Sequence, residues 1–122
     1  MDVVLELNFV GISNENAALT VGFADDEVET TRYFMFQRSL DPQDDDGVYV
    51  ERDGQEHSAY GSVLSCSLER DRISVVLDPS LAAAIDMPAS FAIGFRCGDG
   101  VFRTLRAELP RIFAGTACTV SV

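Results

Sequence analysis

The 122-residue chain contains no lysine and no tryptophan, and His57 is its only histidine. All nine basic residues are arginines, against twenty acidic residues, which gives a formal net charge of −11. A field of this sign repels nucleic acid and anionic membrane surfaces and attracts basic partners, although acidity also serves simply to keep a small protein soluble. A single histidine does not supply the ligand set of a typical zinc enzyme. Without tryptophan, we expect Phe, Leu, Val and Ile to fill the core.

The chain also lacks paired cysteines and long apolar runs. Cys66, Cys97 and Cys118 form no CxxC motif, so their spacing supports neither a zinc site nor a thioredoxin-like site. Free thiols suit a reducing cytosol. No stretch approaches the length of a membrane span, and Asp2 stands where a signal peptide would carry basic residues. The sequence therefore predicts a cytoplasmic protein with one domain over residues 1–122.

Alternation of apolar and polar residues predicts short strands along most of the chain. The expected strands are about 2–12, 17–24, 31–38, 48–52, 55–60, 63–69, 72–78, 91–97 and 101–106, with a further edge strand possible within 117–122. The aromatic run Tyr33–Phe36 predicts a strand that is covered on both faces. Asp53-Gly54 favours a two-residue type I′ turn, because both central positions of that turn need positive φ. In the hairpin that spans 63–78, we expect these residues to be buried: Leu64, Leu68, Ile73, Val75 and Leu77.

One short helix is predicted near 79–87, because Asp78 can cap its first N–H groups and Pro79 fits its first turn. A second helical turn is expected within 105–113, and Pro110 should limit its length. The pattern favours a mostly β fold, with α+β as the alternative. Its antiparallel sheet would fold as a sandwich or a partly closed barrel.

No motif in the chain completes a catalytic, cofactor-binding or metal site. The run Asp44–Gly47 resembles part of an EF-hand loop, but Asp53 would stand where that loop needs Glu. His57 and Ser58 would point to opposite faces of a strand, so they form no catalytic dyad. The segment 98–100 reads Gly-Asp-Gly and lacks the third glycine and the following helix of a dinucleotide fingerprint. We therefore expect no catalytic, cofactor-binding or metal-ligating residue.

Acidic and aromatic residues interleave within Gly47–Gly61, which we call the central hairpin, a composition that suits protein recognition. Tyrosine provides a large anchor with few rotatable bonds, and carboxylates speed encounter with a basic partner. The residues that we expect to bind a partner are Asp25, Asp26, Glu27, Glu29, Asp44, Asp45, Asp46, Tyr49, Glu51, Asp53, Gln55, Glu56, His57 and Tyr60.

Three segments together resemble the tenth immunity-protein family of bacterial polymorphic toxin systems: the aromatic strand Tyr33–Arg38, the stretch VYVERDGQEHSAYG, and the hairpin LSCSLERDRISVVLD. The similarity extends from about Tyr33 to Phe113. It depends most on Glu51, Asp53, Gln55, Tyr60 and Gly61. The resemblance implies a small cytoplasmic protein, without catalytic activity, that binds and occludes a cognate toxin domain. Together with the acidic charge, it points to a basic toxin such as a nuclease. The sequence does not predict the oligomeric state.

Two other functions remain open from the residues alone. The first is a β domain that binds a small ligand or calcium. An apolar cavity with a few converging polar groups would favour it. The second is a hydrolase with a carboxylate site, which needs two carboxylates across a cleft, one of them with a raised pKa.

Overall fold

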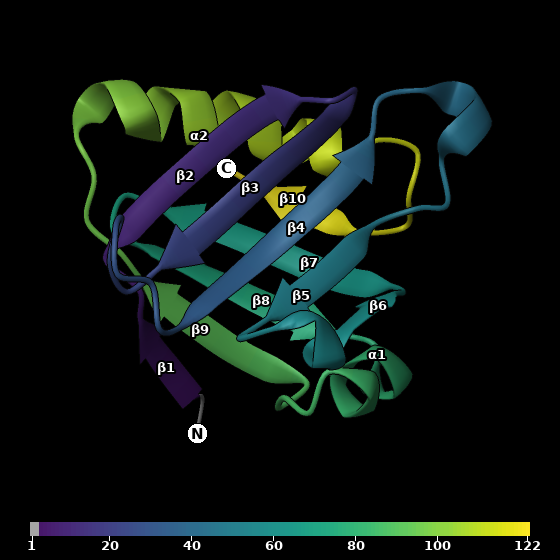
Figure 1. Cartoon of the computed structure of the whole chain (residues 1–122), viewed down its shortest axis with the longest axis horizontal. Coiled ribbons are helices and arrows are strands. Elements are labelled where there is room, and N and C mark those ends of the chain that lie inside the picture. The colour runs from purple at the N-terminus through teal and green to yellow at the C-terminus, as the bar shows by residue number, and fades with distance from the viewer. Residues whose placement is uncertain (1–2) are drawn as a thin grey trace.

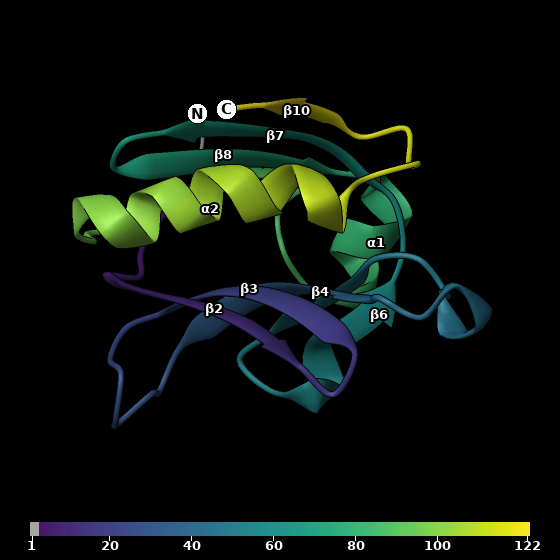
Figure 2. The same ribbon diagram turned by 90° about the horizontal axis from the view of Figure 1, so that it is seen from above.

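In a computed structural model, which describes residues 3–122, ten strands and two α-helices form a layered fold (Figure 1). Sheet A has the order β1 (Val3–Glu6), β9 (Ser90–Gly94), β8 (Arg72–Leu77), β7 (Val63–Glu69) and β10 (Thr119–Ser121). Sheet B has the order β2 (Phe9–Glu15), β3 (Ala18–Ala24), β4 (Tyr33–Ser39), β5 (Tyr49–Arg52) and β6 (Ser58–Tyr60). The two sheets lie in separate layers and do not close into a barrel (Figure 2). The expectation of a mostly β, sandwich-like fold is confirmed.

Phenylalanine rings join the two layers. Phe91 of sheet A meets Phe34 of sheet B with ring centroids 5.1 Å apart, and Phe23 lies 5.5 Å from Phe95. Phe23, Phe34 and Phe91 are inward-pointing residues of their strands, and Phe95 follows the end of β9. The prediction of a core rich in phenylalanine is confirmed, and Cys66 is buried in this core as a free thiol.

Helix α2 (Asp99–Ile112) lies between the two layers along one side of the molecule (Figures 1 and 2). The expected strand at 101–106 is therefore wrong, as is the expectation that no helix follows Gly98. Leu105, Leu109 and Ile112 are buried because their spacing of four and three residues places them on one face of a helix. Pro110 lies inside the helix without ending it. Burial of this apolar face outweighs the local preference for turn and strand.

The first expected strand is divided between the two sheets. Leu7 and Asn8 separate β1, which pairs in parallel with β9, from β2, which pairs antiparallel with β3. β10 also runs parallel to its neighbour, β7, so the all-antiparallel expectation is wrong at both edges of sheet A. Alternation reveals which face of a strand is buried but not which strand it pairs with. The expected start at Asp2 lies outside the described residues.

The hairpin of β7 and β8 forms as expected, with Leu68, Ile73, Val75 and Leu77 buried. Leu64 is an exception, since 45% of it is exposed. The register of the two strands shifts between Val63 and Ser65, and this bulge turns Val63 inwards in place of Leu64.

The expected short helix is also confirmed. Helix α1 (Pro79–Ala84) begins after Asp78, whose carboxylate accepts a hydrogen bond from the N–H of Ser80 at 2.9 Å. It ends before the expected boundary, and Asp86 follows it with a positive φ of 53°. Across residues 3–122, neither helix is long and apolar enough to cross a membrane.

Candidate functional site

The outer surface of sheet B faces the viewer in Figure 1, and both α-helices lie behind it. Strand alternation turns Val21, Phe23, Phe34 and Phe36 into the core, so the residues between them point outwards. We call this outward surface face B. The outward residues used below are Phe9, Gly11, Ala18, Thr20, Gly22, Tyr33, Met35, Tyr49, Glu51, Ser58 and Tyr60. The prediction that Tyr33–Phe36 is covered on both faces is wrong, because Tyr33 and Met35 are only half-buried.

Glu51 is the only polar or charged residue that is buried in the described part of the chain, with 8% exposed. The Tyr33 hydroxyl donates a hydrogen bond to one of its carboxylate oxygens, and the Tyr49 hydroxyl donates to the other at 2.5 Å. A buried carboxylate needs such donors to offset its lost hydration. Burial and the Glu51 carboxylate raise the pKa of Tyr33 to about 12, and the same two causes raise the pKa of Tyr49. Both phenols therefore remain donors at neutral pH.

Tyr60 extends this cluster to the edge of sheet B. It pairs with Tyr49 across the strands, and the two ring centroids are 5.3 Å apart. Tyr60 is 57% exposed. Two tyrosines thus hold the Glu51 carboxylate, and a third, on the next strand, packs against one of them.

Asp53 holds the end of face B together. Its carboxylate accepts the Tyr33 N–H at 2.9 Å and lies 3.1 Å from Arg52 and 3.2 Å from Arg32. Partial burial works to raise the pKa of Asp53, but the Tyr33 N–H and the two guanidinium groups outweigh it, so the pKa is lowered. Its position among two arginines gives this carboxylate a structural role at the end of the sheet.

The connection after Asp53 differs from the expected two-residue turn. Asp53 has a positive φ of 54°, but Gly54 has φ 129° and ψ 159°, which does not fit a type I′ turn. Gln55–His57 form a 3-10 turn, η2, before β6 begins. Gln55 and Glu56 are exposed, and the Nδ1 atom of His57 is buried without a hydrogen bond, 3.8 Å from a Glu56 oxygen.

One predicted acidic cluster lies in the loop between β3 and β4, beside Asp53. Asp25 accepts hydrogen bonds from the Thr31 hydroxyl and from the N–H groups of Arg32 and Thr31, which lower its pKa to about 2. Asp26 accepts from the N–H groups of two residues, Val28 and Glu29. These carboxylates shape the loop, while the side chains of Glu27 and Glu29 remain exposed.

The other acidic cluster lies in the loop between β4 and β5, which includes the 3-10 turn η1 (Pro42–Asp44), at the opposite end of face B (Figure 1). Asp45 pairs with Arg38 at 2.9 Å, and this guanidinium lowers the pKa of Asp45. Arg38 also donates to the carbonyl oxygens of Ile112, at 3.0 Å, and Ala114, beyond the end of α2. Asp44 and Asp46 are exposed, and their side chains make no hydrogen bond or ion pair within residues 3–122. The structure therefore separates the two acidic clusters.

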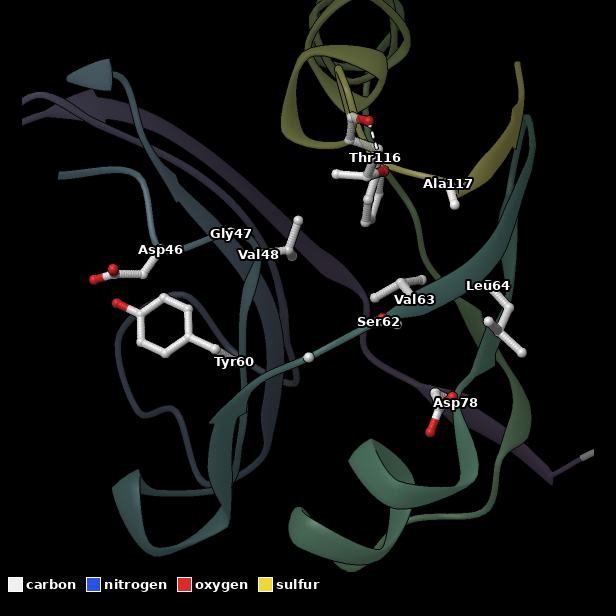
Figure 3. A pocket seen from close by; sticks show the side chains of 12 residues that line it. Asp46, Gly47, Val48, Tyr60, Ser62, Val63, Leu64, Asp78, Thr116 and Ala117 are labelled. Carbon is white, nitrogen blue, oxygen red and sulfur yellow. Dashed lines mark hydrogen bonds between the residues drawn. The ribbon is translucent and has the colours of Figure 1, made fainter. Parts of the chain in front are cut away.

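A pocket of about 520 Å³ opens between the two sheets, where the chain crosses from β6 to β7 (Figure 3). Val48 and Val63 line it, Asp46 and Tyr60 lie on one side, and Asp78 lies on the other. In a small-molecule site, a few polar groups converge on one point. The polar groups of this pocket do not. Asp78 caps α1, and the hydroxyl and N–H of Ser80 lower its pKa, the opposite of what a general acid needs. Within residues 3–122, no group of three or more His, Cys, Asp or Glu could hold a metal ion.

Three residues of face B were not among the predicted site residues. Tyr33 is separated from Glu51 by a loop and a strand, and only the pairing of β4 with β5 brings them together. Gly11 and Gly22 also lie on this face, opposite one another. The available signal was strand alternation: each glycine lies between two inward-pointing residues of its strand, which places it on the outward face.

Comparison with known proteins identifies a family. A model of the family described as immunity protein 10 matches residues 6–103. This segment contains all of sheet B and begins well before Tyr33, where the expected similarity starts. Neither a comparison with curated proteins nor one with solved structures gave a match.

Proposed function

The chain belongs to the immunity protein 10 family of polymorphic toxin systems, and we propose that it neutralises its cognate toxin by covering a functional surface of that toxin with face B. Members of this family are not enzymes. A protein without catalytic activity must block the toxin by binding to it. Such occlusion requires a surface that is exposed, pre-formed and large enough to exclude the toxin's substrate. Face B is the sheet surface that has these features and carries the tyrosines of the central hairpin.

The Tyr33–Glu51–Tyr49 cluster is the observation that carries this proposal. Tyrosine is enriched at the centres of protein interfaces, and side chains that are ordered before binding lose less entropy on association. The buried Glu51 carboxylate fixes two of the tyrosines. Tyr60 packs beside Tyr49 and presents its exposed ring to the partner.

Charge supports a basic toxin, such as a nuclease, as the partner. The chain carries −11, and the loops at both ends of face B contain exposed carboxylates. An acidic surface attracts the basic site with which a nuclease holds phosphates. We place this encounter in the cytoplasm, where the free cysteines stay reduced.

The test is to co-express the protein with the toxin domain encoded beside its gene, and to measure growth rescue and binding kinetics. We expect Tyr60→Ala to cost about 2 kcal/mol of binding free energy, equivalent to roughly thirtyfold faster dissociation. Val3→Ala provides a matched control, because Val3 is exposed and apolar but lies on sheet A. Equal effects of the two substitutions, or unchanged dissociation for Tyr60→Ala, would show that face B is not the binding surface.

A further inference from the structure

Two glycines lie opposite one another in the middle of sheet B. Gly11 of β2 pairs with Gly22 of β3, which in turn pairs with Met35 of β4. Glycine weakens the interior of a strand, because it loses more backbone entropy than other residues and brings no side chain to pack. In a strand it often marks a place where another group approaches closely.

Neither the backbone nor the packing requires glycine at these positions. The described glycines with positive φ are Gly47, Gly54 and Gly115, so Gly11 and Gly22 have backbones that other residues can adopt. A Cβ atom at Gly22 would meet the Met35 Cβ at 3.6 Å, and one at Gly11 would meet the Phe9 ring at 3.4 Å. Both are ordinary contacts. The two glycines therefore matter for the space that they leave open.

That space is an apolar hollow of about 230 Å³ on face B. Gly11 and Gly22 line it together with Phe9, Tyr33 and Met35. An enclosed apolar cavity of roughly 150 Å³ binds one benzene molecule. The hollow therefore has room for a single large apolar side chain.

We propose that this hollow receives one apolar side chain, aromatic or branched, that projects from a basic surface of the toxin. The inference rests on the proposed function and adds the chemistry of the anchor that face B accepts. Thr30, at the end of the acidic loop that begins at Asp25, also lines the hollow. A basic surface around the anchor would complement this loop, and the loop together with Tyr33 would exclude water from the contact.

Gly22→Val tests the proposal, because it fills the hollow with a side chain that suits a strand. We expect the variant to fold with unchanged or increased stability in urea unfolding and to dissociate from the toxin domain at least about tenfold faster. Gly22→Ala, which fills less of the hollow, should have a smaller effect in the same direction. Ala18→Val is the matched control: it lies on the same strand and the same face, does not line the hollow, and should leave dissociation unchanged.

The outcomes separate this inference from the proposed function. If the wild-type protein does not bind the toxin domain, the proposed function fails. If it binds and both Gly22→Val and Gly11→Val bind equally well, the hollow is not an anchor site, while the proposed function stands. A marked loss of stability in Gly22→Val would contradict the claim that packing leaves room for a side chain. If light scattering shows a wild-type dimer that Gly22→Val converts to a monomer, a second copy occupies the hollow and the proposal is overturned.

Discussion

The Glu51 carboxylate is buried, although it lies on face B, which no other layer of the described fold covers. Its two hydrogen bonds come from Tyr33 on the neighbouring strand β4 and from Tyr49, two residues earlier on β5, and each bond orients one tyrosine ring. Removing either hydroxyl leaves part of the buried charge unsatisfied. The same cluster thus contributes to stability and to the shape of face B.

Tyr33→Phe should lower the free energy of unfolding at neutral pH by about 1–2 kcal/mol, since it removes a hydrogen bond to a charged group. It should also change the alkaline limit of stability. The pKa of Tyr33 is raised from 10.0 to about 12 in the folded protein, so its contribution is complete below pH 10 and is lost as the pH rises through 12. Urea unfolding across this range should show a steeper loss for the wild type than for Tyr33→Phe. Tyr60→Phe is the control, because the Tyr60 hydroxyl makes no hydrogen bond to Glu51.

Cys118 should react with iodoacetamide before Cys66. Contact with the Cys66 thiol lowers the pKa of Cys118, while the same contact and burial raise the pKa of Cys66. The thiolate is the reactive form, so mass spectrometry of the folded protein should find the label first on Cys118. Cys66→Ala removes this contact and should slow the labelling of Cys118. An unchanged rate would contradict this contact.

At the scale of elements, a connection of two residues between β6 and β7 carries the chain from sheet B to sheet A. Gly61 lies on this crossing, and a Cβ atom there would approach the Leu81 side chain of α1 to between 3.0 and 3.2 Å. Gly61→Ala should therefore cost about 1–3 kcal/mol of stability through overpacking. Gly100→Ala, in the first turn of α2 where the nearest atom is 3.9 Å away, should be neutral or slightly stabilising. Urea unfolding of both variants distinguishes a local clash from a general cost of losing glycine.

Elements with a complete local signal were predictable from the sequence. The hairpin of β7 and β8 alternates on both strands, and α1 has its cap at Asp78 and a proline at its first turn. α2 was harder, because Pro110 opposes a helix locally while three buried apolar residues favour it. The division between β1 and β2 has no local signal, since it depends on β9, which lies more than eighty residues later.

The candidate site was predictable in composition but not in geometry. Acidic and aromatic residues of the central hairpin do lie on or beside face B. Their roles come from partners that only sheet pairing brings near, such as Tyr33 for Glu51 and Arg32 for Asp53. The two acidic clusters looked alike in sequence, yet Asp25 shapes a loop while Asp44 and Asp46 remain unpaired.

At the scale of the whole molecule, the position of the charges should affect the rate of association more than the net charge does. Asp44→Asn with Asp46→Asn removes two unpaired charges at one end of face B, and association with the toxin domain should slow at low salt. Salt screens exposed charges, so the difference from wild type should shrink at high salt. Glu69→Gln with Asp71→Asn removes the same charge from the exposed β7–β8 turn of sheet A and should have less effect. Equal slowing by both pairs would show that only net charge steers the encounter.

Calcium should leave the thermal stability unchanged beyond the effect of an equal concentration of magnesium. Asp44 and Asp46 are exposed, and Asp45 forms an ion pair with Arg38. The three carboxylates therefore do not converge as calcium ligands. Calcium at 100 times the dissociation constant of such a site would add about 2.7 kcal/mol to the free energy of unfolding. A melting temperature that rises by several degrees with calcium alone would contradict the structure of this loop.

The two parallel edge strands, β1 and β10, place both described ends of the chain on sheet A (Figure 2). Face B belongs to the other layer and points away from them. A fluorescent label, a biosensor tether or a fused domain attached at either end would therefore project from the back of the molecule. Such a fusion should leave face B open to the solution, and a protein tethered to a surface by either end should display that face outwards.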